Sequence, residues 1–212
     1  MTNNIAEALK SAYNAITEFQ TKQQLNQQSR LIAVSKTKPA AAVTAAYQAG
    51  QRAFGENYVQ ELVSKATELH QLEGIEWHFI GPVQSNKTKD IALHADWVHS
   101  IDRLKIAERL SAQRPLDKAP LEVLLQVNIS NEPSKAGIAA ADMLQLAADV
   151  SNLPQLQLKG LMAIPAPGMS EPAFAAMAQL SKTLQQHYPQ YRRRAQQPGR
   201  KRHRHAVPGS SL

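Results

Sequence analysis

The stretch RLIAVSKTKPAAAVTAAYQAGQRAF, residues 30–54, contains the structural unit from which the rest of the chain is built. Its run over 31–35 is apolar until the serine, which is the pattern of a short strand buried on both faces. Pro39 suits the first turn of a helix, and residues 40–49 are mostly strong helix formers that stop at a glycine. A second short strand is expected at 52–54. The stretch therefore predicts strand, helix and strand in succession.

The same order repeats along the chain, after a leading helix predicted over residues 3–27 from apolar residues spaced three and four apart. Further strands are expected at Trp77–Ile80, Trp97–Ile101, Glu122–Val127 and Leu156–Ala163. Further helices are expected at 59–69, Lys87–His94, Asp102–Gln113, Ala139–Ser151 and Pro172–Gln186. Asp102 is a candidate N-cap for the helix that it begins.

Six strand–helix units without a hairpin signal predict an α/β fold with a parallel sheet, either doubly wound or closed into a barrel. A dinucleotide-binding sheet would carry G-x-G-x-x-G after a strand, and this sequence does not. Polar residues instead follow several different strands, as they do at the active-site end of a β/α barrel. We therefore predict a (β/α)8 TIM-barrel type, with residues 1–190 as one domain in which six of the eight units are recognisable.

The composition excludes several classes of protein. A hydrophobic content of 43% with 19% charged residues is globular rather than disordered. With no cysteine, the chain has no disulfide, thiolate metal site or cysteine nucleophile. No apolar run approaches the ~20 residues that cross a bilayer, and the N-terminus does not resemble a signal peptide. A cytoplasmic location is expected.

The net charge of +7 is concentrated in the last segment of the chain. Residues 192–212 contain six arginines and one lysine with no acidic residue, whereas residues 1–191 hold 17 basic and 17 acidic side chains. Such a tail could neutralise several phosphates of a nucleic acid. Because the body is neutral, nucleic-acid binding is an unfavoured alternative.

Lys36 ends the first predicted strand, where a barrel would direct its amine into the mouth. Partial desolvation or a nearby cation lowers the pKa of such an amine and makes it a nucleophile toward an aldehyde. The alternative is an ordinary solvated lysine. Three further residues are candidates for ligand binding, and each also has a structural interpretation. Asn57 could cap a helix, and His78 could be a packed, hydrogen-bonded core histidine. Asn128 ends a strand before a polar loop. We predict no catalytic side chains and no metal ligands.

Six segments carry a resemblance to a known family. They are AVSKTKP (33–39), FGENYVQE (54–61), WHFIGPVQSNK (77–87), SIDR (100–103), QVNISNEPSKAGI (126–138) and GLMAIPAPG (160–168). Each is weak alone, but the ordered set, which spans roughly residues 5–190, closely resembles the pyridoxal phosphate homeostasis protein family. The resemblance implies a single-domain barrel similar to the N-terminal domain of alanine racemase.

The resemblance also implies a cofactor and a role. Pyridoxal 5′-phosphate (PLP) would be held as a Schiff base on Lys36, with Asn57 close to the cofactor ring and His78 and Asn128 lining the site. Lys135 matches a position with a secondary role in cofactor exchange. The family is thought to bind PLP and supply it to PLP-accepting apo-enzymes, with no established turnover reaction. Its members tend to be monomeric.

The C-terminal segment departs from the family pattern. From about Tyr191 the chain is rich in arginine, where the family continues with a seventh and an eighth strand that hold the cofactor phosphate. We therefore interpret residues 191–212 as a basic tail, disordered or translated out of frame, and we expect weakened phosphate binding. A six-stranded sheet would have two unpaired edges, which predicts low stability or self-association.

An enzyme is the second alternative. A PLP-dependent racemase or lyase could share this fold, but racemases of the fold use a further β-rich domain and a tyrosine acid/base. This chain has no room for that domain. We therefore expect a PLP carrier that is not an enzyme.

Overall fold

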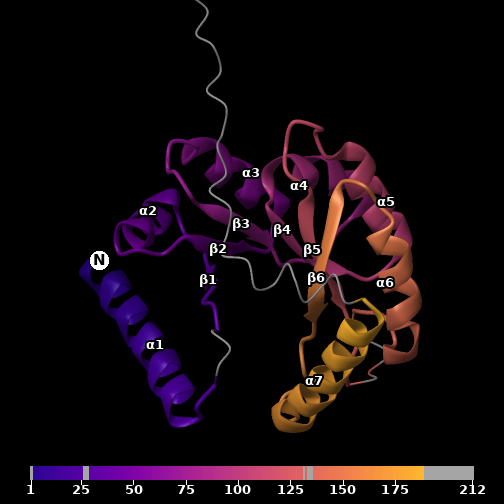
Figure 1. The fold of residues 1–212 in the computed structure, drawn as a ribbon. Helices are drawn as coiled ribbons and strands as arrows, with labels where there is room; N and C mark the ends of the chain where they lie inside the picture. Colours follow the sequence, from indigo (N-terminus) through magenta and orange to yellow (C-terminus); the bar gives the residue numbers. More distant parts are fainter. Residues whose placement is uncertain (1, 26–28, 131, 133–135, 189–212) are drawn as a thin grey trace, which may run out of the picture.

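The computed structural model describes residues 2–25, 29–130, 132 and 136–188, and its strands form a single parallel sheet (Figure 1). The strands are β1 Ala33–Val34, β2 Ala53–Glu56, β3 Glu76–Phe79, β4 Trp97–Ile101, β5 Leu121–Gln126 and β6 Leu156–Met162. The α-helices are α1 Thr2–Lys22, α2 Ala40–Gln48, α3 Val59–Glu68, α4 Thr88–His94, α5 Leu104–Gln113, α6 Met143–Ser151 and α7 Ser170–His187. Two 3-10 turns, Ser85–Lys87 and Ala140–Asp142, precede α4 and α6.

The strand order distinguishes the two predicted architectures. Neighbouring strands follow the chain, β1-β2-β3-β4-β5-β6, and every pair is parallel. A doubly wound sheet reverses its strand order at a switch point, whereas sequential order is that of a β/α barrel. Within the described residues the sheet is not closed, and β1 and β6 are its two edges. The predicted tail, residues 191–212, lies outside the described residues.

Side chains alternate between the two faces of the curved sheet. One face packs against the surrounding helices through fully buried apolar residues, among them Phe54, Phe79, Val98, Val123 and Leu125. The other face carries a continuous row whose members pair from strand to strand: Val34, Gly55, His78, Trp97, Glu122 and Gln157. Figure 1 shows the helices around the convex side, with α1 and α7 beside the two edge strands.

The structure corrects some predicted boundaries. The first helix ends at Lys22, and the first strand is limited to Ala33–Val34. Asp102 as an N-cap is wrong, because the N-cap position of α5 is Arg103 in extended conformation. The Asp102 carboxylate instead accepts a 2.7 Å hydrogen bond from the Arg103 guanidinium. Among the described helices, none combines the length and the apolar character that a bilayer crossing needs.

Candidate functional site

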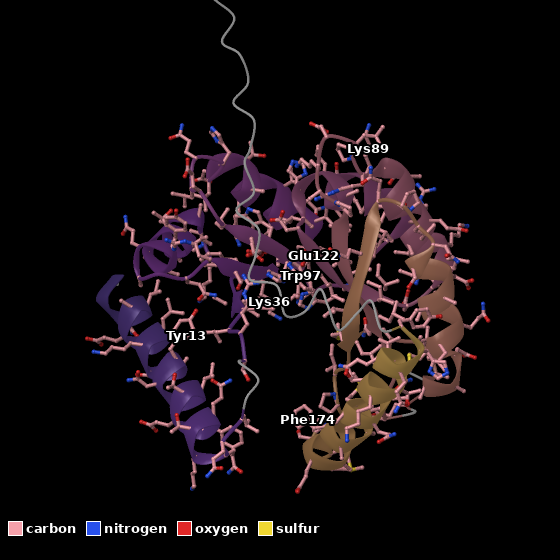
Figure 2. All side chains as sticks on the ribbon, in the orientation of Figure 1. Tyr13, Lys36, Lys89, Trp97, Glu122 and Phe174 are labelled. Atoms are coloured by element: carbon pink, nitrogen blue, oxygen red, sulfur yellow. The ribbon has the colours of Figure 1, made fainter. Side chains whose placement is uncertain are left out.

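Lys36 lies two residues beyond the carboxyl end of β1, close to the strand end at which it was predicted (Figure 2). Its side chain is exposed, two residues beyond Val34 in the inner row. Val34 pairs with Gly55, so Asn57 stands at the corresponding place beyond β2. Since the carboxyl ends of parallel strands meet at one end of a barrel, Lys36 and Asn57 share the end where such folds place their chemistry.

The residue before Lys36 is fixed by its neighbours. Ser35 donates its backbone N–H to the Gly55 carbonyl at 2.9 Å and its hydroxyl to Oε1 of Glu56 at 2.6 Å. Its carbonyl accepts a 2.7 Å hydrogen bond from Nζ of Lys65 on α3. Ser35 and Glu56 are buried, so these bonds lie in the layer between the sheet and the helix. The backbone next to Lys36 is therefore held by hydrogen bonds on the side that faces α3.

Lys65 links two carboxylates in this layer. Its Nζ lies 2.8 Å from Oε1 of Glu56 and 2.7 Å from Oε2 of Glu61. The same oxygen of Glu61 accepts the backbone N–H of Thr37 at 2.8 Å, and the Lys65 hydrogen bond lowers the pKa of the Glu61 carboxyl. Thr37 has φ of +61°, a left-handed conformation that a β-branched residue rarely adopts. Both chain neighbours of Lys36 are thus bonded to one buried network.

Asn57 is half-buried and held in place by a close approach of two loops. The Asn57 backbone carbonyl occupies the space where a Cβ on Gly81 would stand, so a side chain at position 81 would displace it. The carbonyl of Gly81 in turn accepts the Ser100 hydroxyl at 2.5 Å. Asn57 does not cap α3, because the N-cap position is Tyr58 and no side-chain cap bond forms.

His78 lies in β3 with only 2% of its surface exposed, one row below Lys36. Its Nδ1 is 2.9 Å from Nε2 of His99, and its ring stacks on Trp97 with centroids 5.4 Å apart. Burial is the main cause that lowers the pKa of His78 to about 2 and that of His99 to about 4. Both rings are therefore neutral at pH 7, as the packed-histidine interpretation requires.

Asn128 follows β5, and its side chain closes the loop that follows. Its Nδ2 donates to the Glu132 carbonyl at 2.8 Å, and its Oδ1 accepts the Glu132 N–H at 3.3 Å. Its own backbone N–H donates to the Ile138 carbonyl at 2.9 Å. These bonds give Asn128 a structural role at the same end of the sheet. Lys135 lies outside the described residues.

Sequence reasoning missed the network behind Lys36 and the partner of His78. A signal for Lys65 was present, because it lies on the apolar face of α3 between Leu62 and Leu69, four residues after Glu61. A lysine at such a position is seldom buried without an acidic partner. His99 had no comparable signal, since its contact with His78 depends on the register between β3 and β4.

The arrangement offers an exposed lysine between two residues that are hydrogen-bonded to Glu56, Glu61 and Lys65. A primary amine in this setting can bond to an aldehyde carbon, which fits the chemistry of PLP. Of the residues that the structure describes, no three His, Asp or Glu side chains are grouped so that they could hold a metal ion.

The sequence is similar to that of characterised proteins. The family model "alanine racemase, N-terminal domain" matches residues 14–203. The pyridoxal phosphate homeostasis protein of Haemophilus influenzae is 57% identical over 166 residues, which cover 76% of this chain and 70% of that protein. Its counterpart in Escherichia coli K12 is 54% identical, with 78% and 72% covered, and that of Pseudomonas aeruginosa is 59% identical, with 73% and 67% covered.

Solved structures agree with the fold. PipY from Synechococcus elongatus PCC7942, determined with PLP bound, has a TM-score of 0.74 and 40% identity, covering 89% of this chain and 85% of its own. Alanine racemase from Corynebacterium glutamicum has a TM-score of 0.57 at 14% identity, covering 75% of this chain and 45% of its own, a likeness of fold alone. The chain therefore belongs to the pyridoxal phosphate homeostasis protein family, with the α/β fold of the alanine racemase N-terminal domain.

Proposed function

We propose that this chain binds PLP, holds it as a Schiff base on Lys36, and serves in the homeostasis of intracellular PLP. The observation that carries the proposal is the exposed Lys36 amine at the carboxyl end of β1, on a backbone bonded to a buried network. PLP supplies an aldehyde that a primary amine can hold covalently. The PLP-bound structure of PipY, a relative at 40% identity, supports the choice of cofactor.

Each predicted site residue has a separate part in this proposal. Lys36 provides the amine, and Asn57 places its amide beside the cofactor ring from the end of β2. His78 lines the site one row lower as a neutral ring whose Nδ1 is engaged with His99. Asn128 borders the site through the loop that it closes after β5. The covalent bond and the ring contacts hold the cofactor in this arrangement.

A carrier role fits the chain better than catalysis. The relatives at 54–59% identity are named for PLP homeostasis rather than for a reaction. The alanine racemases share the fold at 12–17% identity, and less than half of each racemase is covered. We therefore propose that PLP passes from Lys36 to PLP-accepting apo-enzymes in the cytoplasm and that the chain turns over no substrate.

Absorbance spectroscopy tests the binding step. Purified protein mixed with PLP should develop an absorption band in the violet region, and borohydride should trap the cofactor on a peptide that contains Lys36. Lys36→Ala should abolish the band. Lys89→Ala is the matched control, because Lys89 is an exposed lysine on α4, away from the end of β1 (Figure 2), and should leave the band unchanged.

Three results would contradict the proposal. If folded protein gives no band, or if Lys36→Ala gives the same band as the parent, Lys36 does not hold PLP. Racemisation of alanine by the PLP-loaded protein would instead show an enzyme and overturn the carrier role.

A further inference from the structure

The network behind Lys36 has a feature that the proposed function does not use. It contains Ser35 and Thr37, the residues on either side of Lys36, but not Lys36 itself. Ser35 is buried and bonded to Glu56 and Lys65 on the side of α3, whereas Lys36 is exposed. The network can therefore act on Lys36 only through the backbone.

Lys65 is the centre of this network and is satisfied there. Its ammonium group has three donors, and it has three acceptors within 2.8 Å: the Ser35 carbonyl and the carboxylates of Glu56 and Glu61. Lys65 is 5% exposed and Glu56 0% exposed. Charges buried to this degree are rare unless they are paired, and loss of the cation would leave the Glu56 carboxylate uncompensated.

Thr37 shows what the network does to the chain. Its backbone N–H is bonded to Glu61 while its φ of +61° turns the chain back. The turn is closed by a 3.1 Å hydrogen bond from the Lys38 N–H to the Ser35 carbonyl, the same oxygen that accepts from Lys65. A strained residue persists only where its surroundings hold it, and such residues cluster at functional sites. Here Glu61 and Lys65 are the residues that hold the turn.

We propose that Lys65, through Glu56 and Glu61, is a positioning residue that fixes the turn 35–38 and so presents the Lys36 amine to its aldehyde ligand. This inference rests on the proposed function and adds a residue to it. Lys65 does not touch the cofactor. Lys65 contributes to the orientation of the Lys36 amine before the bond to the aldehyde forms. It therefore affects the rate at which PLP is captured more than the nature of the bond.

Substitutions at three positions separate the orientation of the Lys36 amine from the stability of the fold. Glu61→Ala removes the acceptor of the Thr37 N–H from a partly exposed site, so the protein should fold and form the PLP band about tenfold more slowly. Adding Thr37→Gly to it should restore part of the rate, because glycine adopts positive φ without a side-chain penalty. Lys65→Met should slow capture at least as much, and Lys65→Arg should slow it less.

Arg114→Met is the matched control for a lost buried cation. Arg114 is buried and donates to the carbonyls of Ala92 and Ala95 at the end of α4, near the amino end of β4. This variant should lower the free energy of unfolding while its folded fraction captures PLP at the parental rate. If Lys65→Met does not fold, Glu61→Ala with and without Thr37→Gly decides the question.

Hydrogen exchange supplies a readout without PLP. The amide protons of Thr37 and Lys38 should exchange slowly in the parent and about tenfold faster in Glu61→Ala, with exchange in β4 unchanged. A parent that captures no PLP would refute the proposed function, and exchange would still decide the positioning role. Unchanged exchange at Thr37, or a parental capture rate in Glu61→Ala, would overturn the inference.

Discussion

The middle strands and the edge strands of this sheet differ sharply in how deeply their residues are buried. All four residues of β2 are buried, and so are four of the five in β4. In β1 neither residue is buried, and the last four of β6 are only half-buried. The middle strands have a neighbour on each side and helices behind them. Burial in this sheet therefore depends on neighbours more than on the hydrophobicity of the strand itself.

The helices show the same contrast. In α5, four of ten residues are buried against the sheet, whereas in the 18-residue α7 only Ala173 and Leu184 are. Phe174 on α7 is 65% exposed, beside the β6 edge (Figure 2). In the part of the chain that the structure describes, the helix beside β6 thus buries a smaller share of its residues than a helix behind the middle of the sheet.

Two phenylalanine substitutions should give the largest difference. Phe79→Ala in β3 removes a fully buried ring and should lower the free energy of unfolding by about 3–5 kcal/mol. Phe174→Ala at the edge should change it by about 0.5 kcal/mol or less. Urea unfolding followed by circular dichroism measures both. Equal losses would show that the edge helix is packed as well as the middle of the sheet.

Acidification should also weaken the middle of the sheet, through the histidine pair. The unfolded chain binds protons on His78 and His99 near pH 6.5, whereas the folded chain binds them only near pH 2 and pH 4. Between these values the unfolded state holds more protons, so the free energy of unfolding falls as the pH falls below about 6.5. At pH 5 the loss should be about 2 kcal/mol for each histidine.

Urea unfolding at pH 7 and pH 5 tests this dependence. His99→Gln should reduce the loss, while His70→Gln, at an exposed position, should leave it unchanged. An identical pH dependence in all three proteins would rule out the buried pair as its source.

The smallest effect on stability, and a clear effect on assembly, is expected at the β1 edge. Val34 is 51% exposed on this edge strand, so Val34→Lys should change the free energy of unfolding by about 0.5 kcal/mol or less. Charged side chains on an edge oppose edge-to-edge pairing, so the variant should self-associate less than the parent in sedimentation experiments.

Leu116→Lys is the control for this experiment, since Leu116 is an exposed apolar residue in the turn after α5. It should leave self-association at the parental level. A reduction as large as that of Val34→Lys would show that general charge, and not the edge, governs assembly.

Much of the fold followed from periodicity in the sequence. The alternation of buried strands with helices predicted every strand from β1 to β6 in the correct order. The predicted bounds of β1 were less accurate. The sequence at 31–35 shows which residues are apolar, but it does not show whether each of them pairs with a residue of β2. The Asp102 cap was wrong because the helix begins one residue later than predicted, with Arg103 at the N-cap position.

The candidate site was predictable only in part. The position of Lys36 at a strand end followed from the pattern, whereas the network behind it depends on which residue of α3 faces β2. The pairing of His78 with His99 depends on a register that periodicity does not give. Local patterns thus located the amine, and long-range packing determined what holds it.

The sequential strand order has a consequence for how the chain can fold. Each strand pairs with the one before it, so every pairing in the described sheet closes a loop of only one helix and its connections. Loops of this length cost less entropy to close than a pairing between strands that are far apart in the sequence. The sheet can grow by one unit at a time during synthesis, with each new strand using the previous one as its template.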